Sequence, residues 1–383
     1  MNKGKVDCVI GICFGDEGKG KIVDYLAKNY DVVARFGGGD NAGHTLFKGG
    51  EKIVLHLVPS GILNEGTLNI IGNGTVINPI SFKKEVEMLQ SIGIDVKSNL
   101  IISDKAHIIT PIHKAWDAYN ERSGKIGTTL KGIGPCYSDK ISRKGIRVGD
   151  ILSPNFKLLG VSLYNQIGLP FDIPDLREFF DACEFMSKFK IEKTEYLINR
   201  FLDEGRSVLA EGAQASGLDI DFGSYPYVTS SVTTTAGVCQ GLGVSPKKIG
   251  KVWGVIKAYT TRVGNGPFET ELFDEIGDEI CKRGNEFGST TGRKRRCGWL
   301  NLDEIKYHSV ICGVDEFVMT KSDVLSGFEE VRVFVNGEYN LMSGWETTDS
   351  DEFWKFADFI EKSTGIKVSI ISCGVGRNDL ILR

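Results

Sequence analysis

The sequence predicts an α/β protein with a large, mostly parallel central sheet flanked by helices. Two observations support this fold class. Short apolar runs that are typical of buried strands alternate with segments of helical periodicity. Each run is followed by a polar or glycine-containing turn, and open parallel sheets bind ligands at the carboxyl ends of their strands. We therefore expect the functional residues to lie in these turns.

The elements can be followed from the N-terminus. Residues 6–12 predict a buried strand, and a glycine loop then leads into an amphipathic segment at residues 21–27. Residues 79–91 predict a helix, because their apolar side chains recur at helical spacing. Further strands are expected at residues 31–36, 68–71, 207–210, 251–259, 316–319 and 368–372.

The composition changes between residue 150 and about residue 206. Aromatic residues stand there among charged residues, and glycines are few. We predict that this segment is a helical insertion or subdomain within a single α/β domain that covers residues 1–383.

The bulk composition argues against several functional classes. The 383 residues carry 46 basic and 50 acidic side chains, a formal charge of -4, without a long basic block, so we expect no nucleic-acid partner. No stretch approaches the roughly 20 apolar residues of a membrane span, and no apolar signal core precedes the first strand. The nine cysteines form no C-x-x-C pair, which favours reduced thiols and a cytoplasmic location.

A phosphate-binding loop is predicted directly after the first strand. GDEGKGK at residues 15–21 matches the G-x-x-x-x-G-K pattern, in which backbone N–H groups and a helix N-terminus face phosphate oxygens. Lys19 or Lys21 can neutralise the transferring phosphoryl group. Ile22 replaces the usual Ser or Thr, so Mg²⁺ needs another ligand, and Asp16 is the candidate.

A guanine-reading tetrapeptide is predicted at the end of a later strand. Thr320-Lys-Ser-Asp323 matches [NT]-K-x-D, in which the carboxylate accepts two hydrogen bonds from guanine and the lysine stem packs along the base. Alone the tetrapeptide is weak, but a phosphate loop in the same chain favours guanine-nucleotide binding.

Five further blocks separate the chain from a simple GTP switch. They are GGDNAGHT (38–45), IGTTLKGIGP (126–135), EGAQ (211–214), DIDFGSYPYVTSS (219–231) and GSTTGRKRRCGW (288–299). Together with GDEGKGK, and in this order, they closely resemble the adenylosuccinate synthetase family. The resemblance extends from Val9 to Arg383.

The resemblance implies a dimeric enzyme with a P-loop-like GTP site that converts IMP, GTP and L-aspartate to adenylosuccinate, GDP and phosphate. Asp16 would take the N1 proton of IMP, His44 would act as an acid at the departing oxygen, and Lys19 and Gln214 would complete the catalytic set. Mg²⁺ would contact Asp16 and the carbonyl of Gly43. Arg143 would reach the site of the partner subunit.

The resemblance also implies three binding sets. GTP would contact Gly15, Glu17, Gly18, Gly20, Lys21, Gly43, Thr45, Arg295, Lys321, Ser322, Asp323, Ser372, Cys373 and Gly374. IMP would contact Asp16, Lys19, Asn41, Ala42, His44, Thr128, Thr129, Arg143, Gln214, Thr229 and Arg293. Aspartate would contact Ser289, Thr290, Thr291, Gly292, Arg293 and Arg295.

The chemistry of the residue types agrees with this activity. A purine 6-oxo group leaves poorly, so its phosphorylation needs a base near N1 and positive charge around the γ-phosphate. We expect the basic run at residues 293–296 to clamp the aspartate carboxylates, because arginine forks match carboxylates. Asp219 and Asp221 are better explained as hydrogen-bond partners of loop backbone.

Two alternatives remain open. Against the family pattern the chain has Phe14, Gly37, Asp40, Leu130-Lys131 and Phe222 at positions where other residues are usual, and it is shorter than usual members. The first alternative is the same chemistry on another purine nucleotide, such as dGMP, although retention of Asp16 favours IMP. The second is a GTP-binding switch without ligase activity, which needs neither His44 nor Gln214.

Overall fold

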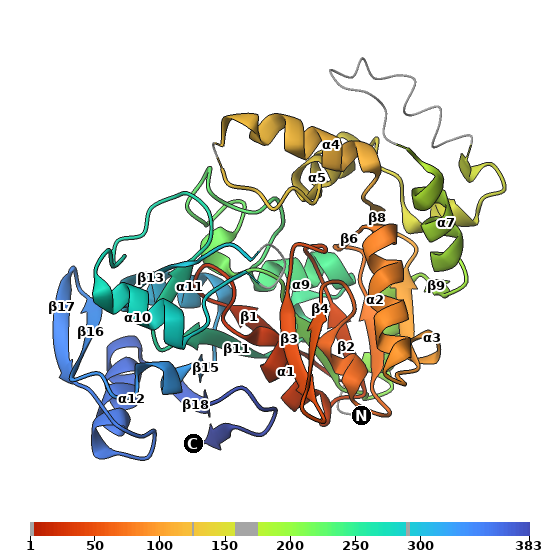
Figure 1. Ribbon diagram of the computed structural model, residues 1–383. Coiled ribbons are helices and arrows are strands. Elements are labelled where there is room, and N and C mark those ends of the chain that lie inside the picture. The colour runs from red at the N-terminus through yellow and green to blue at the C-terminus, as the bar shows by residue number, and fades with distance from the viewer. Residues whose placement is uncertain (1–3, 125, 158–174, 289–291) are drawn as a thin grey trace.

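A computed structural model describes residues 4–124, 126–157, 175–288 and 292–383. Within these residues ten strands form one sheet in the order β19-β18-β15-β11-β1-β10-β2-β5-β7-β9 (Figure 1). All neighbouring pairs are parallel except β18 and β19. The predicted α/β class is therefore confirmed. The strands are β1 (Val6–Gly11), β2 (Val32–Arg35), β5 (Leu68–Ile71), β7 (Leu100–Ser103), β9 (Lys190–Glu192), β10 (Val208–Glu211), β11 (Ile249–Lys257), β15 (Glu316–Thr320), β18 (Lys367–Ser372) and β19 (Leu380–Leu382).

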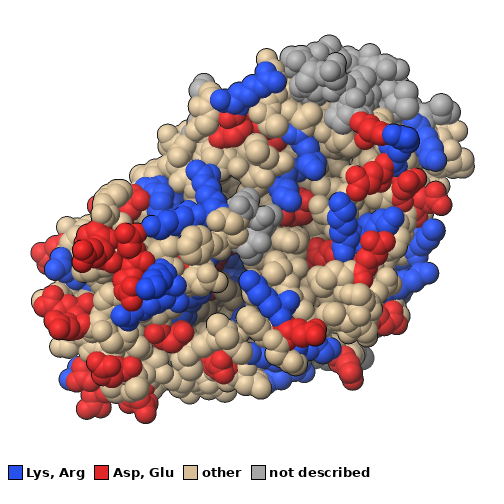
Figure 2. Space-filling view, in the orientation of Figure 1, with Lys and Arg blue, Asp and Glu red and all other residues tan. Residues whose placement is uncertain are grey.

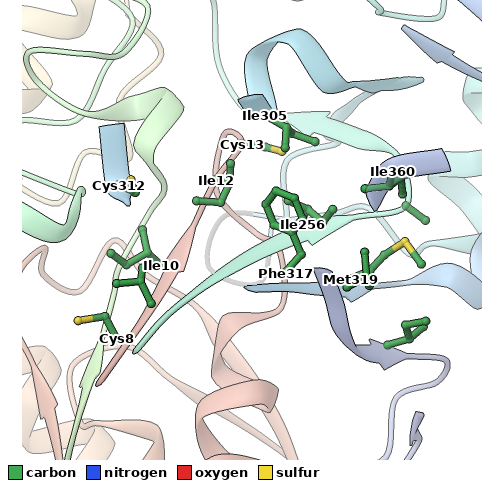
Figure 3. Close-up of a cluster of buried hydrophobic side chains, with 14 of the residues drawn as sticks. Cys8, Ile10, Ile12, Cys13, Ile256, Ile305, Cys312, Phe317, Met319 and Ile360 are labelled. Atoms are coloured by element: carbon green, nitrogen blue, oxygen red, sulfur yellow. The ribbon is translucent and has the colours of Figure 1, made fainter. Parts of the chain in front are cut away.

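Helices cover both faces of this sheet. Successive side chains of a strand point to opposite faces, so Cys8 and Ile10 of β1 pack with α8, α9, α11 and α12, while Val9 packs with α1. Figure 3 shows part of the core on the face of Cys8 and Ile10, where Ile12, Ile256, Phe317 and Met319 lie near residues of α11 and α12. The helices are α1 (Lys19–Ala27), α2 (Pro79–Ser91), α3 (Val96–Asn99), α4 (Pro111–Asn120), α5 (Ile133–Ser142), α7 (Arg177–Met186), α8 (Thr194–Asp203), α9 (Thr235–Leu242), α10 (Glu275–Arg283), α11 (Leu302–Cys312) and α12 (Asp351–Thr364).

Small sheets attach to the main one. β3 (His44–Lys48) and β4 (Glu51–Leu55) form a hairpin, β12 (Thr260–Arg262) pairs with β13 (Arg296–Gly298), and β6 (Val76–Ile77) pairs with β8 (His107–Ile108). β14 (Leu300–Asn301) joins the hairpin of β16 (Glu330–Val335) and β17 (Glu338–Ser343). The hairpin of β3 and β4 matters for function because it begins at His44.

The segment expected to be a helical insertion is only partly helical. It contains α7 and α8, but between them β9 adds an edge strand to the main sheet beside β7, with Ile102 opposite Ile191. Residues 158–174 lie outside the described residues. Three residues are too few to show strand periodicity in the sequence, which explains why β9 was not predicted.

The visible face of the molecule carries side chains of both charges (Figure 2). On the face shown in Figure 2 acidic and basic side chains are interspersed, and several basic side chains surround the hollow in the middle of the view. In the part of the chain that the structure describes, no helix combines the length and apolar character needed to cross a membrane.

Candidate functional site

The order of the strands brings the predicted motifs to one edge. β18, β15, β11, β1, β10 and β2 are adjacent and parallel, so the segments that follow them meet at their carboxyl ends. Residues 372–374 follow β18, the tetrapeptide 320–323 follows β15, and the phosphate loop follows β1. EGAQ begins in β10, and GGDNAGHT follows β2. The predicted guanine, phosphate and base regions thus lie in sequence along this edge.

The phosphate loop has the backbone that its glycines predict. Gly15 and Gly18 have φ of 87° and 83°, a left-handed conformation that favours glycine, and Asp16 between them also has a positive φ of 60°. Glu17 is buried and accepts from the backbone N–H of Gly15 at 2.7 Å and from Lys19 Nζ at 2.6 Å. Lys19 is therefore held at the start of α1 by an internal ion pair.

Asp16 has a cationic neighbour from the basic run. Its Oδ2 lies 2.8 Å from Nε of Arg295, and the Asp16 side chain is 30% exposed whereas that of Arg295 is 8% exposed. The contact places Arg295 beside the proposed base. Ile22 is fully buried among apolar neighbours of α1, which agrees with the prediction that position 22 supplies no metal ligand.

His44 is oriented by a buried carboxylate. Its Nδ1 is 2.5 Å from Oε1 of Glu211, which is fully buried at the end of β10. Ser60 donates to both oxygens of Glu211, through Oγ at 2.6 Å and through its backbone N–H at 2.7 Å. Burial alone would raise the pKa of Glu211, but His44 and Ser60 lower it below its usual value. The His44 ring also packs on Gly20, where an added Cβ would lie 2.6 Å from the Cβ of His44.

The GGDNAGHT turn is fixed from beneath by a buried arginine. Arg35, at the end of β2, donates to the carbonyl oxygens of Gly37 at 3.3 Å and Gly39 at 2.7 Å. Asn41 accepts from the Gly39 backbone N–H at 3.1 Å, and Ala42 accepts from the ring of His56 at 2.6 Å. Gly43 and Thr45 flank His44 at the start of β3. These internal contacts fix the conformation of the turn.

Asp40, one of the departures from the family pattern, is part of the scaffold. It is buried, and its Oδ2 accepts from Ser81 Oγ at 2.6 Å and from Asn78 Nδ2 at 3.2 Å. Asn78 caps the N-terminus of α2, accepting from the backbone of Ile80 and Ser81. Asp40 therefore ties the turn to α2.

Gln214 and Thr229 lie on neighbouring loops. Gln214 has a positive φ of 56°, and its Oε1 is buried without a hydrogen-bond partner among the described residues. Thr229 donates its backbone N–H to Leu218 at 2.9 Å. Asp219 organises this loop by accepting from backbone N–H groups of Asp221, Phe222 and Thr233, which is the structural role predicted for it. A buried unsatisfied amide oxygen calls for an explanation, and a bound base would supply its partner.

The guanine region is linked to the phosphate loop at two points. Thr320 Oγ1 donates to the carbonyl of Glu17 at 2.6 Å. Lys21, expected at the phosphates, instead donates to Ser372 Oγ and to the carbonyls of Gly374 and Asp379, at 2.8, 2.8 and 3.1 Å. Lys21 thus fastens the loop that contains Cys373.

The tetrapeptide itself presents its acid to the surface. Ser322 is buried and donates to the carbonyl of Ser372 at 3.1 Å. Lys321 adopts a left-handed φ of 59°, whereas Asp323 is exposed. An exposed carboxylate beside residues 372–374 is available to a ligand.

The four cations of residues 293–296 do not act together. Lys294 pairs with exposed Asp278 at 2.7 Å, and Arg296 makes a two-nitrogen contact with Glu271. A four-cation clamp is therefore not supported for Lys294 and Arg296. Arg293 is exposed, and its Nη1 lies near Gly127, 3.2 Å from where a Cβ would be. This contact brings Arg293 to the loop of Thr128 and Thr129, both partly buried.

Some predicted residues fall elsewhere. Ser289, Thr290 and Thr291 lie outside the described residues, and Gly292 adjoins them with φ of 66°. Arg143 is exposed at the C-terminal end of α5, with φ of 64°. The pairing of Glu211 with His44 was not predicted, although the EGAQ block contains Glu211. Arg35 and Glu286, which hold other residues of the site in place, were not predicted to have any role.

The residues present fit a Mg²⁺ ion that is shared with a nucleotide. No group of three or more His, Cys, Asp or Glu side chains that could hold a metal is found in the described ranges. Mg²⁺ commonly uses one or two protein oxygens, waters and substrate phosphates rather than an all-protein cage. Asp16, partly exposed within a phosphate loop, provides such an oxygen.

A phosphate loop, a guanine-type tetrapeptide, Asp16 and an oriented His44 lie on one sheet edge, an arrangement that suits a GTP-dependent ligase. The family model described as adenylosuccinate synthetase matches residues 8–353. Adenylosuccinate synthetase from Parabacteroides distasonis is 48% identical over 419 residues, covering 99% of each chain. The chain belongs to the adenylosuccinate synthetase family.

Solved structures agree with this assignment. The fully ligated adenylosuccinate synthetase from Plasmodium falciparum matches with a TM-score of 0.93 and 38% identity, covering 99% of this chain and 100% of that one. Succinoaminodeoxyadenylate synthetase of cyanophage S-2L, bound to dGMP and dATP, matches with a TM-score of 0.71 and 20% identity. The match covers 99% of this chain and 95% of that one. The second likeness shows the fold alone. These comparisons favour neither the dGMP alternative nor the switch.

Proposed function

We propose that this chain ligates L-aspartate to IMP at the expense of GTP, giving adenylosuccinate, GDP and phosphate. The observation that carries the proposal is the placement of Gln214 and His44 against the phosphate loop: Gln214 lies beside Gly15, which precedes Asp16, and the oriented His44 lies against Gly20. The whole chain, residues 1–383, acts as one α/β unit.

The first step transfers a phosphoryl group to the 6-oxygen of IMP. Asp16 takes the N1 proton, and electrons move from the N1–C6 system to the oxygen, which attacks the γ-phosphorus and releases GDP. Lys19 lies at the N-terminus of α1, where its charge and the helix N–H groups favour anions. Gln214 donates to the 6-oxygen through its side-chain NH2, whereas its buried Oε1 accepts from a donor of the bound nucleotide.

The second step forms the C–N bond. The aspartate amino group attacks C6, loses a proton, and phosphate leaves with the 6-oxygen. His44 stabilises that oxygen through Nε2, because Glu211 occupies Nδ1. An anionic partner favours a proton on Nδ1 and stabilises the imidazolium when His44 is charged.

Three binding regions follow. IMP contacts Asn41, Ala42, Thr128, Thr129, Thr229 and Arg293 in addition to Asp16, Lys19, His44 and Gln214. GTP is held by Gly15, Glu17, Gly18, Gly20, Lys21, Gly43, Thr45, Lys321 to Asp323, Ser372 to Gly374 and Arg295. Aspartate is held by residues 289–293 and Arg295. When bound, Mg²⁺ neutralises phosphate charge, and Asp16 and the Gly43 carbonyl would hold it.

Assembly and location complete the proposal. The chain forms a homodimer in which Arg143, exposed at the end of α5, contributes to the IMP site of the partner subunit. All nine cysteines are free and none is fully exposed, which suits a reducing cytoplasm.

Steady-state kinetics with each co-substrate omitted in turn tests the function. Phosphate release should require IMP, GTP and aspartate together. Phosphate release from GTP alone would support a switch and contradict a ligase. Turnover with dGMP but not with IMP would replace the substrate that we propose.

A further inference from the structure

Glu286 is a buried acid that the reaction described above does not use. It follows α10, and its side chain is fully buried. Its backbone carbonyl accepts from the Arg295 N–H at 2.9 Å. The segment that follows α10 is therefore joined directly to the basic run at residues 293–296.

Three cations surround the Glu286 carboxylate. Oε1 accepts from Lys257 Nζ at 2.9 Å and from Tyr259 Oη at 2.5 Å, and Lys321 Nζ is 3.3 Å away. Oε2 accepts from Arg295 Nη1 at 2.6 Å. Burial alone would raise the pKa of Glu286, but these cations lower it far below its ordinary value, so the group stays ionised.

Two of these cations belong to different parts of the nucleotide site. Arg295 uses Nη1 for Glu286 while its Nε faces Asp16 of the phosphate loop. Lys321 belongs to the guanine tetrapeptide and also donates to the carbonyl of Gly284, two residues before Glu286. Without the carboxylate, three buried or half-buried cations would repel one another, which is a large penalty in a water-poor site.

We propose that Glu286 is a positioning residue that fixes Arg295 and Lys321 relative to each other, so that the phosphate end and the guanine end of the GTP site keep one geometry. This inference rests on the proposed function. The side-chain contacts of Glu286 are to Lys257, Tyr259, Arg295 and Lys321, none of which is assigned to IMP.

The test compares Glu286→Gln with a matched control. Gln keeps the shape but not the charge, so GDP affinity measured by calorimetry should fall about tenfold and the KM values of GTP and aspartate should rise together. IMP affinity should stay within about twofold of wild type. Glu279→Gln removes an exposed acid of α10 that pairs with Arg283 at 2.7 Å, and it should change none of these values. Glu286→Asp keeps the charge and should recover part of the GDP affinity.

Unchanged GDP affinity in folded Glu286→Gln would overturn the proposal, and so would an equal loss of IMP affinity, which indicates general damage. If Glu286→Gln does not fold, Glu286→Asp decides: a selective loss of GDP affinity supports the proposal and a wild-type value contradicts it. GDP calorimetry does not depend on turnover, so an inactive wild type would refute the ligase function without removing the result for Glu286.

Discussion

Individual side chains in this site are held by buried carboxylates that the sequence motifs do not reveal by themselves. Glu211 would be costly to bury alone, but two donors from Ser60 and the His44 ring satisfy it. Asp16 and His44, for which we propose direct chemical roles, could be proposed from the sequence because they stand in polar glycine-rich turns. The residues that orient His44, Glu211 of β10 and its partner Ser60, come from distant segments. Ser60 and Glu211 are 151 residues apart, so their contact leaves no local pattern in the sequence.

Replacing Glu211 by Gln tests the role of the charge on His44. The amide is nearly isosteric but cannot stabilise an imidazolium, so kcat should fall about 100-fold with little change in the KM values. Steady-state kinetics with all three substrates measures this. Glu204→Gln, at an exposed acid that follows α8, is the control and should behave as wild type. A kcat within about twofold of wild type for Glu211→Gln would contradict the role.

At the scale of elements, α1 serves both as the phosphate helix and as the anchor of the C-terminal loop. Asp24 of α1 is buried and makes two contacts with Arg377, at 2.5 and 2.6 Å, while Lys21 binds the same loop from the preceding turn. Bidentate pairs of this kind fix geometry as well as adding stability. The loop at residues 372–379, which we propose to lie near guanine, is therefore held by α1, the helix that follows the phosphate loop.

Asp24→Asn should weaken guanine-nucleotide binding without changing the chemistry. Loss of the charged pair leaves Arg377 without its anion, so the loop is less ordered and GDP affinity should fall about tenfold, whereas kcat at saturating GTP stays near wild type. Calorimetry with GDP and steady-state kinetics measure both quantities. Lys28→Met, at the exposed end of the same helix, is the control. A large fall in kcat with normal GDP affinity would show that Asp24 acts elsewhere.

The buried strands and the amphipathic helix α2 were predicted well, whereas the edge hairpins and the shortest strand were not. The core strands β1, β5, β10 and β11 lie within a few residues of their predicted ranges, and α2 matches residues 79–91. The hairpins of β3 with β4 and of β16 with β17 alternate buried and exposed residues at the edge of the fold, and β9 has three residues. The two strands of each hairpin pair with each other, whereas β9 depends on a distant partner, β7, which single-sequence periodicity does not contain.

At the scale of the whole molecule, function follows from strand order. Five motifs spread between residue 15 and residue 374 become neighbours because β18, β15, β11, β1, β10 and β2 are adjacent. The sequence predicts each strand and the turn after it, and the strand-end rule predicts one common edge. It does not predict the order within that edge, since parallel crossovers of many lengths are compatible with the same local patterns.

The folded molecule should lose stability on mild acidification because it buries neutral histidines. Burial lowers the pKa of His107 and of His308 to about 4 in each case, from the ordinary value near 6.5. Between these pH values the unfolded chain binds protons that the folded chain does not. The stabilisation is therefore complete above about pH 6.5 and is lost as the pH falls toward 4, at about 1.4 kcal/mol per pH unit for each histidine.

Urea unfolding at pH 7 and pH 5 measures this dependence. Carboxyl groups also titrate in this range, so the informative quantity is the difference between wild type and His308→Gln, which has no group to protonate at that position. Between the two pH values His308→Gln should lose about 2 kcal/mol less free energy of unfolding than wild type, even though it starts from a lower value at pH 7. An identical loss in both proteins would mean that His308 is protonated in the folded state as readily as in the unfolded chain, and that helix α11 admits water at this position.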